Sequence, residues 1–75
     1  MNRPFTPPRK LKYSEWQQIA DALAAVEEAE ADLGLPKGNH YLLQMTLRRI
    51  CGVDTNKENM KEVARDVIDT DFIPD

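Results

Sequence analysis

The chain has few residues that could carry out covalent or acid–base chemistry, and their spacing does not form a catalytic site. Cys51 is the only cysteine and His40 the only histidine. Cys51 falls near the end of a predicted helix, where the helix dipole opposes a thiolate. Ser14 is better explained as a helix cap than as a nucleophile. We therefore expect a protein that is not an enzyme and that carries no cofactor.

A metal site is not expected either. One cysteine and one histidine supply too few ligands for a zinc site. Asp54, Asn56 and Glu58 alternate as the ligands of a calcium loop do. However, Asn59 stands where that loop needs glycine, and Arg65 stands where it needs a bidentate glutamate.

The length of the chain predicts one small domain with a thin core. A chain of 75 residues buries only about 60–65% of the surface that its unfolded form exposes. Neither a disulfide nor a metal is on hand to reinforce it, so we expect self-association, most simply as a homodimer. A lone cysteine is typical of a reducing compartment. No run of residues approaches the ~20 apolar residues of a membrane span. We therefore expect a cytoplasmic protein without a membrane partner.

Charge is segregated along the chain, although the net charge is only −3. Residues 1–12 carry only bases and residues 13–36 only acids, whereas residues 37–53 carry only bases and residues 54–75 mostly acids. The first block also contains prolines, which disfavour helix. We expect residues 1–12 to form a flexible, extended basic arm, and residues 13–75 to form the single domain.

Apolar residues recur at helical spacing in three segments, which predicts helices over residues 14–33, 40–51 and 56–69. No segment alternates with period two, so no strand is expected. The predicted fold is all-α, a small three-helix bundle with an extended N-terminal basic arm, in an oligomer.

Residues with capping chemistry flank each predicted helix. The predicted N-terminal caps are Ser14 with Gln17, Asn39, and Thr55 with Glu58, and the predicted helix ends are Gly34 with Pro36 and Gly52.

The apolar residues of the second helix spread over more than half of its circumference, which indicates contact with two or more neighbours. Trp16 is expected to pack against the second or third helix. Phe72 and Ile73 lie beyond the third helix, and we expect them to fold back onto the bundle.

Acidic residues crowd the second half of the first helix. Like charges three or four residues apart repel, and the dipole at a helix C-terminus is unfavourable to anions. No base within the helix compensates for them, and such a conflict with local preference can mark a functional surface. A solvated face that keeps a small protein soluble is the alternative.

Arg48 and Arg49 form the complementary basic feature. Near a helix C-terminus they favour the dipole, and arginine is also enriched at interface hot spots. Adjacent residues diverge by about 100° around a helix. We therefore expect one arginine to pair with the first helix and the other to face a partner. The predicted partner-binding residues are Arg48, Arg49, Lys37, Glu27, Glu28, Glu30 and Asp32.

These features favour a small non-catalytic protein–protein interaction module of phage or microbial accessory type. It would act as a regulator, adaptor or inhibitor through its segregated acidic and basic faces. The first alternative is a nucleic-acid-associated regulator with a degenerate helix-turn-helix at residues 43–69, turning at Gly52. Arg48 there replaces the small residue that such a motif needs, and the nearby acids repel phosphates. The second alternative is an acidic mimic of nucleic acid that inhibits a basic protein.

Overall fold

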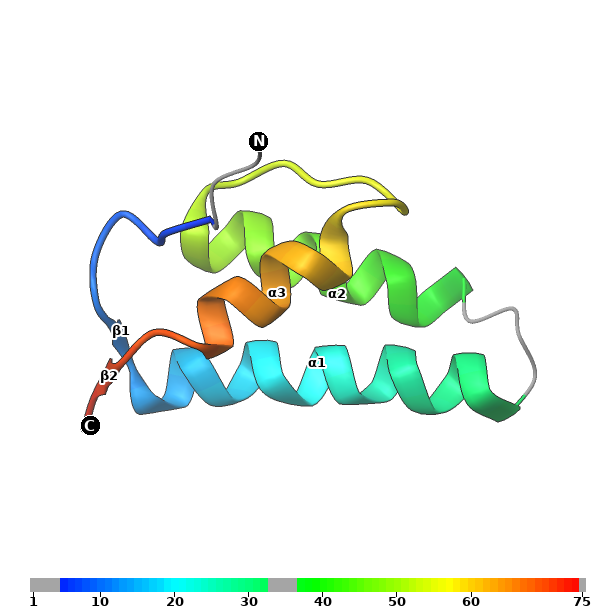
Figure 1. The fold of residues 1–75 in the computed structure, drawn as a ribbon, viewed down its shortest axis with the longest axis horizontal. Coiled ribbons are helices and arrows are strands. Elements are labelled where there is room, and N and C mark those ends of the chain that lie inside the picture. Colours follow the sequence, from blue (N-terminus) through cyan, green and yellow to red (C-terminus); the bar gives the residue numbers. More distant parts are fainter. Residues whose placement is uncertain (1–4, 33–36, 75) are drawn as a thin grey trace.

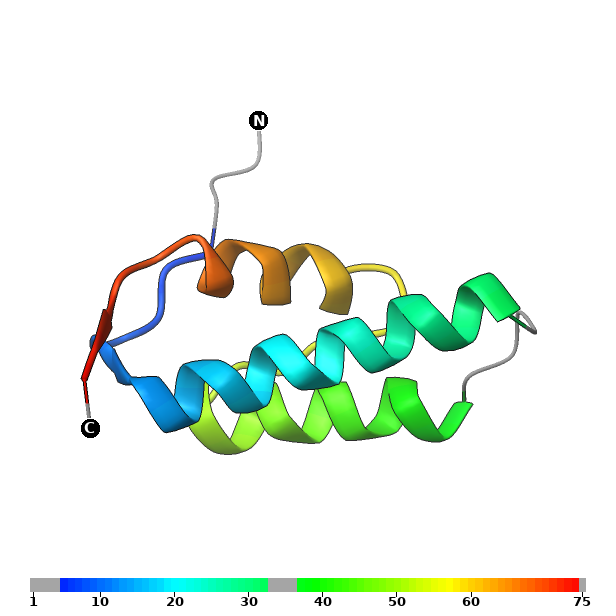
Figure 2. The same ribbon diagram turned by 90° about the horizontal axis from the view of Figure 1, so that it is seen from below.

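The computed structural model describes residues 5–32 and 37–74, which contain three helices and two short strands. Their order is β1 (Leu11–Lys12), α1 (Tyr13–Asp32), α2 (Lys37–Cys51), α3 (Met60–Ile68) and β2 (Phe72–Ile73). α1 packs against both α2 and α3, which contact each other less (Figures 1 and 2). The predicted three-helix architecture is confirmed.

The core lies where the three helices face one another. Each helix contributes residues three or four positions apart, as the apolar spacing predicted. The fully buried side chains of the helices include Ile19, Val26, Leu43, Leu47, Met60 and Val67. Thr46 is a buried polar residue within this packing, and its hydroxyl donates to the carbonyl of Leu42 at 2.7 Å.

The prediction that the chain has no strand is wrong. β1 and β2 pair in parallel, with Leu11 opposite Phe72 and Lys12 opposite Ile73. Strands of two residues are too short to produce a period-two pattern, so no sequence signal pointed to them. The pairing fastens the segment before α1 to the segment after α3 at one pole of the bundle (Figure 1).

An aromatic cluster packs beside this strand pair. The ring of Phe72 lies 5.0 Å from that of Trp16 and 5.1 Å from that of Tyr13, measured between centroids. The indole N–H of Trp16 donates to the carbonyl of Ile68 at the end of α3, at 3.1 Å. Phe72 therefore folds back onto its own chain, and Trp16 packs toward α3, as expected.

Residues 5–12 contact the bundle, and the chain bends at Pro8 and Arg9 before it enters β1. Leu11 is 1% exposed and belongs to the core. The backbone N–H of Phe5 donates to the carboxylate of Asp66 at 2.9 Å. The guanidinium of Arg9 binds both carboxylate oxygens of Glu15. The flexibility expected for residues 1–12 stays a prediction.

The predicted cap of the first helix is shifted. α1 begins at Tyr13, and the carboxylate of Glu15 accepts a hydrogen bond from the backbone N–H of Lys12 at 3.0 Å. Gln17 instead bonds to the side chains of Tyr13 and Asp21. The chain enters α1 directly from β1, so the start of the helix lies before the serine that the sequence pattern favoured.

The predicted cap of the third helix is also wrong, because Asn59 and not Thr55 stands at the N-cap position of α3, and the Asn56 side chain closes the turn before it. The side-chain oxygen of Asn56 accepts from the backbone N–H groups of Glu58 and Asn59, both at 2.9 Å. The side chain of Asn59 accepts in return from the N–H of Asn56 at 2.8 Å. Asparagine caps as well as threonine does, and the hydroxyl of Thr55 is buried without a partner among the described residues. A turn follows, and α3 begins only at Met60.

α2 begins at Lys37, so Asn39 lies inside the helix rather than capping it. Its amide donates to the carbonyl of Ala25 on α1 at 3.3 Å. Gly52 ends the helix as predicted, with φ +70° and its N–H bonded to the carbonyl of Arg48 at 2.9 Å. The predicted helix end at Gly34 and Pro36 lies outside the described residues.

Candidate partner-binding surface

Two of the acidic residues predicted to bind a partner are paired within the chain. The carboxylate of Glu27 binds Arg65, and that of Glu30 binds Lys61 at 2.7 Å and His40 at 3.0 Å. The hydrogen bond from Lys61, and to a smaller extent the one with His40, holds the pKa of Glu30 below its usual range. Glu27 and Glu30, which no base in α1 offsets, are therefore paired with bases on α3 and α2.

Glu28 lies on a different side of α1 and is exposed. Among the described side chains, none forms an ion pair with it. It lines a shallow hollow together with Ala25, Ala29 and Asn39, on the face that α1 shares with α2. The side chains of Asp32 and Lys37, also predicted to bind a partner, lie outside the described part of the chain.

The solvent-facing side of α2 carries large apolar residues. Tyr41 is 65% exposed, Leu42 is 52% exposed and Met45 is 38% exposed. Arg48 and Arg49 continue the same line, at the i, i+1, i+4, i+7 and i+8 spacing of one helix face. We call these five residues the outer stripe of α2. Singly exposed apolar residues are ordinary, but a contiguous group on one face is typical of an interaction site.

The two arginines of the outer stripe have different surroundings. Arg49 donates to the side-chain oxygen of Gln18 on α1 at 2.8 Å. Arg48 lies 3.6 Å from Asp54, and both of these side chains are largely exposed, so their pairing contributes little to stability. Arg49 thus contacts the first helix, as predicted for one of the two arginines, and Arg48 is largely exposed; that Arg48 faces a partner stays a prediction.

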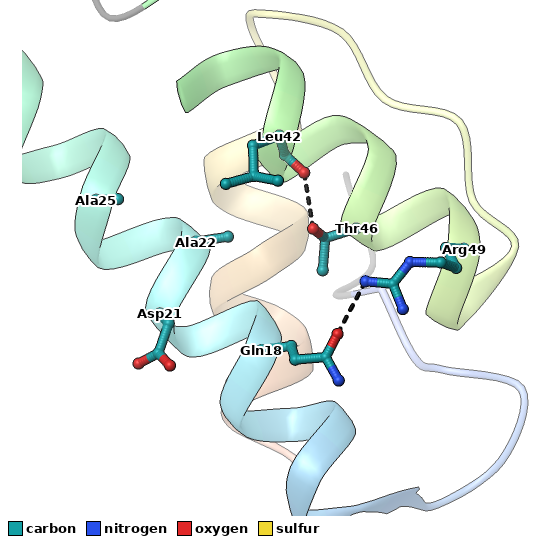
Figure 3. Close-up of a pocket in the computed structure, with 7 residues that line it drawn as sticks. All are labelled: Gln18, Asp21, Ala22, Ala25, Leu42, Thr46 and Arg49. Atoms are coloured by element: carbon teal, nitrogen blue, oxygen red, sulfur yellow. Dashed lines mark hydrogen bonds between the residues drawn. The ribbon is translucent and has the colours of Figure 1, made fainter. Parts of the chain in front are cut away.

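A groove of about 280 Å³ adjoins the outer stripe, between α1 and α2. Figure 3 shows the side chains of Leu42, Thr46 and Arg49 on α2 facing those of Gln18 and Ala22 on α1. The small alanine side chains of α1 leave this space open. The groove therefore extends the apolar surface of the outer stripe onto the neighbouring helix.

The residues with reactive side chains are not brought together. His40 and Cys51 lie eleven residues apart on α2, which places them about 16 Å apart along the helix axis. Burial raises the pKa of the Cys51 thiol, which disfavours a nucleophilic thiolate. Within residues 5–32 and 37–74, no group of three or more His, Cys, Asp or Glu side chains is placed to hold a metal ion.

The connection between α2 and α3 does not have helix-turn-helix geometry. It runs from Gly52 to Asn59, whereas that motif uses a turn of about three or four residues. Thr55, Asn56 and Lys57, which a reading helix would present to bases, lie in the connection before α3.

Comparison with known proteins found no family model that matches the chain, and no match among curated proteins or solved structures. None of the helices in the described part of the chain is long and apolar enough to cross a membrane.

Sequence reasoning identified the two arginines but missed Tyr41, Leu42 and Met45 as surface residues. The available signal was the excess of apolar positions around the second helix, which we interpreted as contact with two neighbours. Within one chain, the buried side is already supplied by residues such as Leu43 and Leu47. The side chains of Tyr41, Leu42 and Met45 lie outside this buried side and are exposed.

Proposed function

We propose that this protein is a small helical protein-interaction module. The partner docks on the outer stripe of α2 and the adjoining groove. The observation that carries the proposal is the exposure of Tyr41, Leu42 and Met45 on a single helix face. Covering such a face removes apolar surface from water, at about 25 cal/mol per Å².

The composition of the outer stripe supports a protein partner. Interface centres are enriched in tyrosine, methionine and arginine, and all three are present within about two turns of α2. A stripe along one helix face, with residues at i, i+4, i+7 and i+8 from Tyr41, matches the way in which helices dock on helices or in grooves. Arg48 and Arg49 at one end favour a partner that carries acidic residues there.

The two alternative functions have less support. A nucleic-acid regulator would need a reading helix, but the long connection separates α3 from α2, and exposed Glu62 and Asp69 would face phosphates unfavourably. A mimic of nucleic acid needs an array of free anions. Because Glu27 and Glu30 are bound to bases of the same chain, that array is reduced.

Site-specific photocrosslinking in the cells that make the protein tests this proposal. A benzophenone side chain at position 42 should give light-dependent adducts of defined mass. The matched control places the same group at position 62, which is also exposed but lies on α3. If position 42 yields no more adduct than position 62, the outer stripe is not a docking surface and the proposal fails.

A further inference from the structure

The charges of α1 and α2 are complementary to each other. α1 contains acidic residues and no lysine or arginine, whereas α2 contains basic residues and no aspartate or glutamate. These two helices together form the face that holds the groove. A surface with one acidic edge and one basic edge can pair with itself under two-fold symmetry, because each edge then meets its opposite.

The acids available for such pairing are those that the bundle does not already use. Glu27 and Glu30 are bound to Arg65 and Lys61 on α3. Glu28 is exposed at the C-terminal half of α1 and lies beside the start of α2.

We propose that the partner on the outer stripe is a second copy of this chain, docked with its α2 antiparallel about a two-fold axis. This inference rests on the proposed function, and it names the partner. The axis passes between Leu42 and Met45, so the apolar residues of the two stripes cover each other. Each copy then buries the exposed side chains of Tyr41, Leu42 and Met45.

The register follows from helix geometry. Arg48 and Arg49 lie about five residues, or about 7.5 Å, beyond the midpoint between Leu42 and Met45. In the antiparallel pair, these arginines lie opposite the point on the other α2 that is about five residues before its midpoint. That point is next to Asn39 of the second copy.

Asn39 lines the same hollow as Glu28. The basic end of each stripe therefore meets the exposed Glu28 carboxylate of the other copy, and symmetry forms this contact twice. Ala25 and Ala29 complete the hollow, and their small side chains leave room for an arginine to approach. The antiparallel arrangement thus satisfies the apolar and the charged parts of the face together.

Charge exchange tests this arrangement with the full chain. Sedimentation should show wild-type protein as a dimer of the 8.6 kDa chain. The Arg48→Glu, Arg49→Glu double variant and the Glu28→Lys variant should each raise the dimer Kd by about 100-fold or more, because every repulsion occurs twice. Glu62→Lys makes the same charge change as Glu28→Lys on exposed α3 and should leave the Kd unchanged. All changed residues are exposed, and circular dichroism should show that their helices are retained.

Mixing the two dimer-weakened variants gives the decisive result. In the mixed dimer, the two introduced glutamates of one copy meet the introduced lysine at position 28 of the other. The native arginines meet the native Glu28, so a heterodimer should form from two monomeric proteins. Wild-type protein that remains monomeric at every concentration reached, or a mixture that stays monomeric, overturns the inference. Adducts of position 42 with a foreign protein, alongside a monomeric chain, would leave the proposed function standing without the second copy.

Discussion

Replacing Leu11 by alanine should destabilise the protein strongly, although this residue precedes all three helices. Leu11 is 1% exposed and packs in the same cluster as the helix residues. Truncating a fully buried leucine removes its transfer free energy and leaves a cavity, at a cost of about 2–5 kcal/mol. A chain of this length has a free energy of unfolding of about 4–11 kcal/mol. The substitution should therefore remove a large part of the total.

Urea unfolding followed by the fluorescence of Trp16 measures this loss. The midpoint should fall with an unchanged slope, because the surface exposed on unfolding is nearly the same. The melting temperature should fall by at least about 8 °C, at about 4 °C or more per kcal/mol for a domain of this size. Lys12→Ala is the matched control, since Lys12 is the exposed neighbour in β1 and its loss should cost less than about 0.5 kcal/mol.

Equal urea midpoints for Leu11→Ala and Lys12→Ala would refute the reasoning. Such a result would mean that residues before α1 do not contribute to the core in solution. The flexible arm predicted over residues 1–12 would then include Leu11, and the strand pairing would contribute nothing to stability.

Three further substitutions test local features of the fold. Asn56→Ala should cost about 1 kcal/mol in urea unfolding by removing the two hydrogen bonds that its side chain accepts in the turn before α3; an unchanged midpoint would show that this turn does not form. Gly52→Ala should destabilise the protein by about 1 kcal/mol or more, because Gly52 has a φ of +70°. Gly38→Ala should stabilise it, because Gly38 lies in a helix and has open space around it. The opposite ranking of the two variants would contradict the left-handed ending of α2. Arg9 and the N–H of Lys12 lower the pKa of Glu15 to about 2, so its contribution to stability is present above its unfolded pKa of about 4.5 and is lost as the pH falls toward 2. The difference in free energy of unfolding between wild type and Glu15→Gln should therefore become smaller as the pH is lowered. A difference that does not change with pH would be inconsistent with the pairing of Glu15 and Arg9.

The helices were predictable because the information for them is local. Met60, Ala64 and Val67 repeat at helical spacing, and they are buried in α3 as expected. Gly52 ends α2 by a rule that depends on one residue. The strands and the exact caps were not predictable in the same way. The start of α1 depends on β1, which precedes it directly. β1 forms only because the segment at Phe72, sixty-one residues after Leu11, pairs with it.

The candidate site was predictable only in part. Arg48 and Arg49 were identified from residue type and position. That the acids of the first helix bind a partner stays a prediction, but their pairing within the chain was not predictable, because Lys61 lies thirty-one residues from Glu30. A pattern within one helix shows that charge is uncompensated there, but it does not show which helix will approach. The structure supplies that approach, and it leaves Glu28 exposed and without an ion pair among the described side chains.

The parallel pairing of β1 and β2 has a mechanical consequence. The N-terminal segment connects to the start of β1, and the C-terminal segment connects to the end of β2. Because the strands are parallel, a force that pulls the two termini apart acts along the two strands in opposite directions. Once residues 5–10 have been peeled from the bundle, the load falls on the hydrogen bonds between the strands in shear, with all of them strained together. The three helices lie between β1 and β2 in the chain, so they carry no tension until the strand pair breaks. The two-stranded sheet therefore governs how the molecule resists stretching.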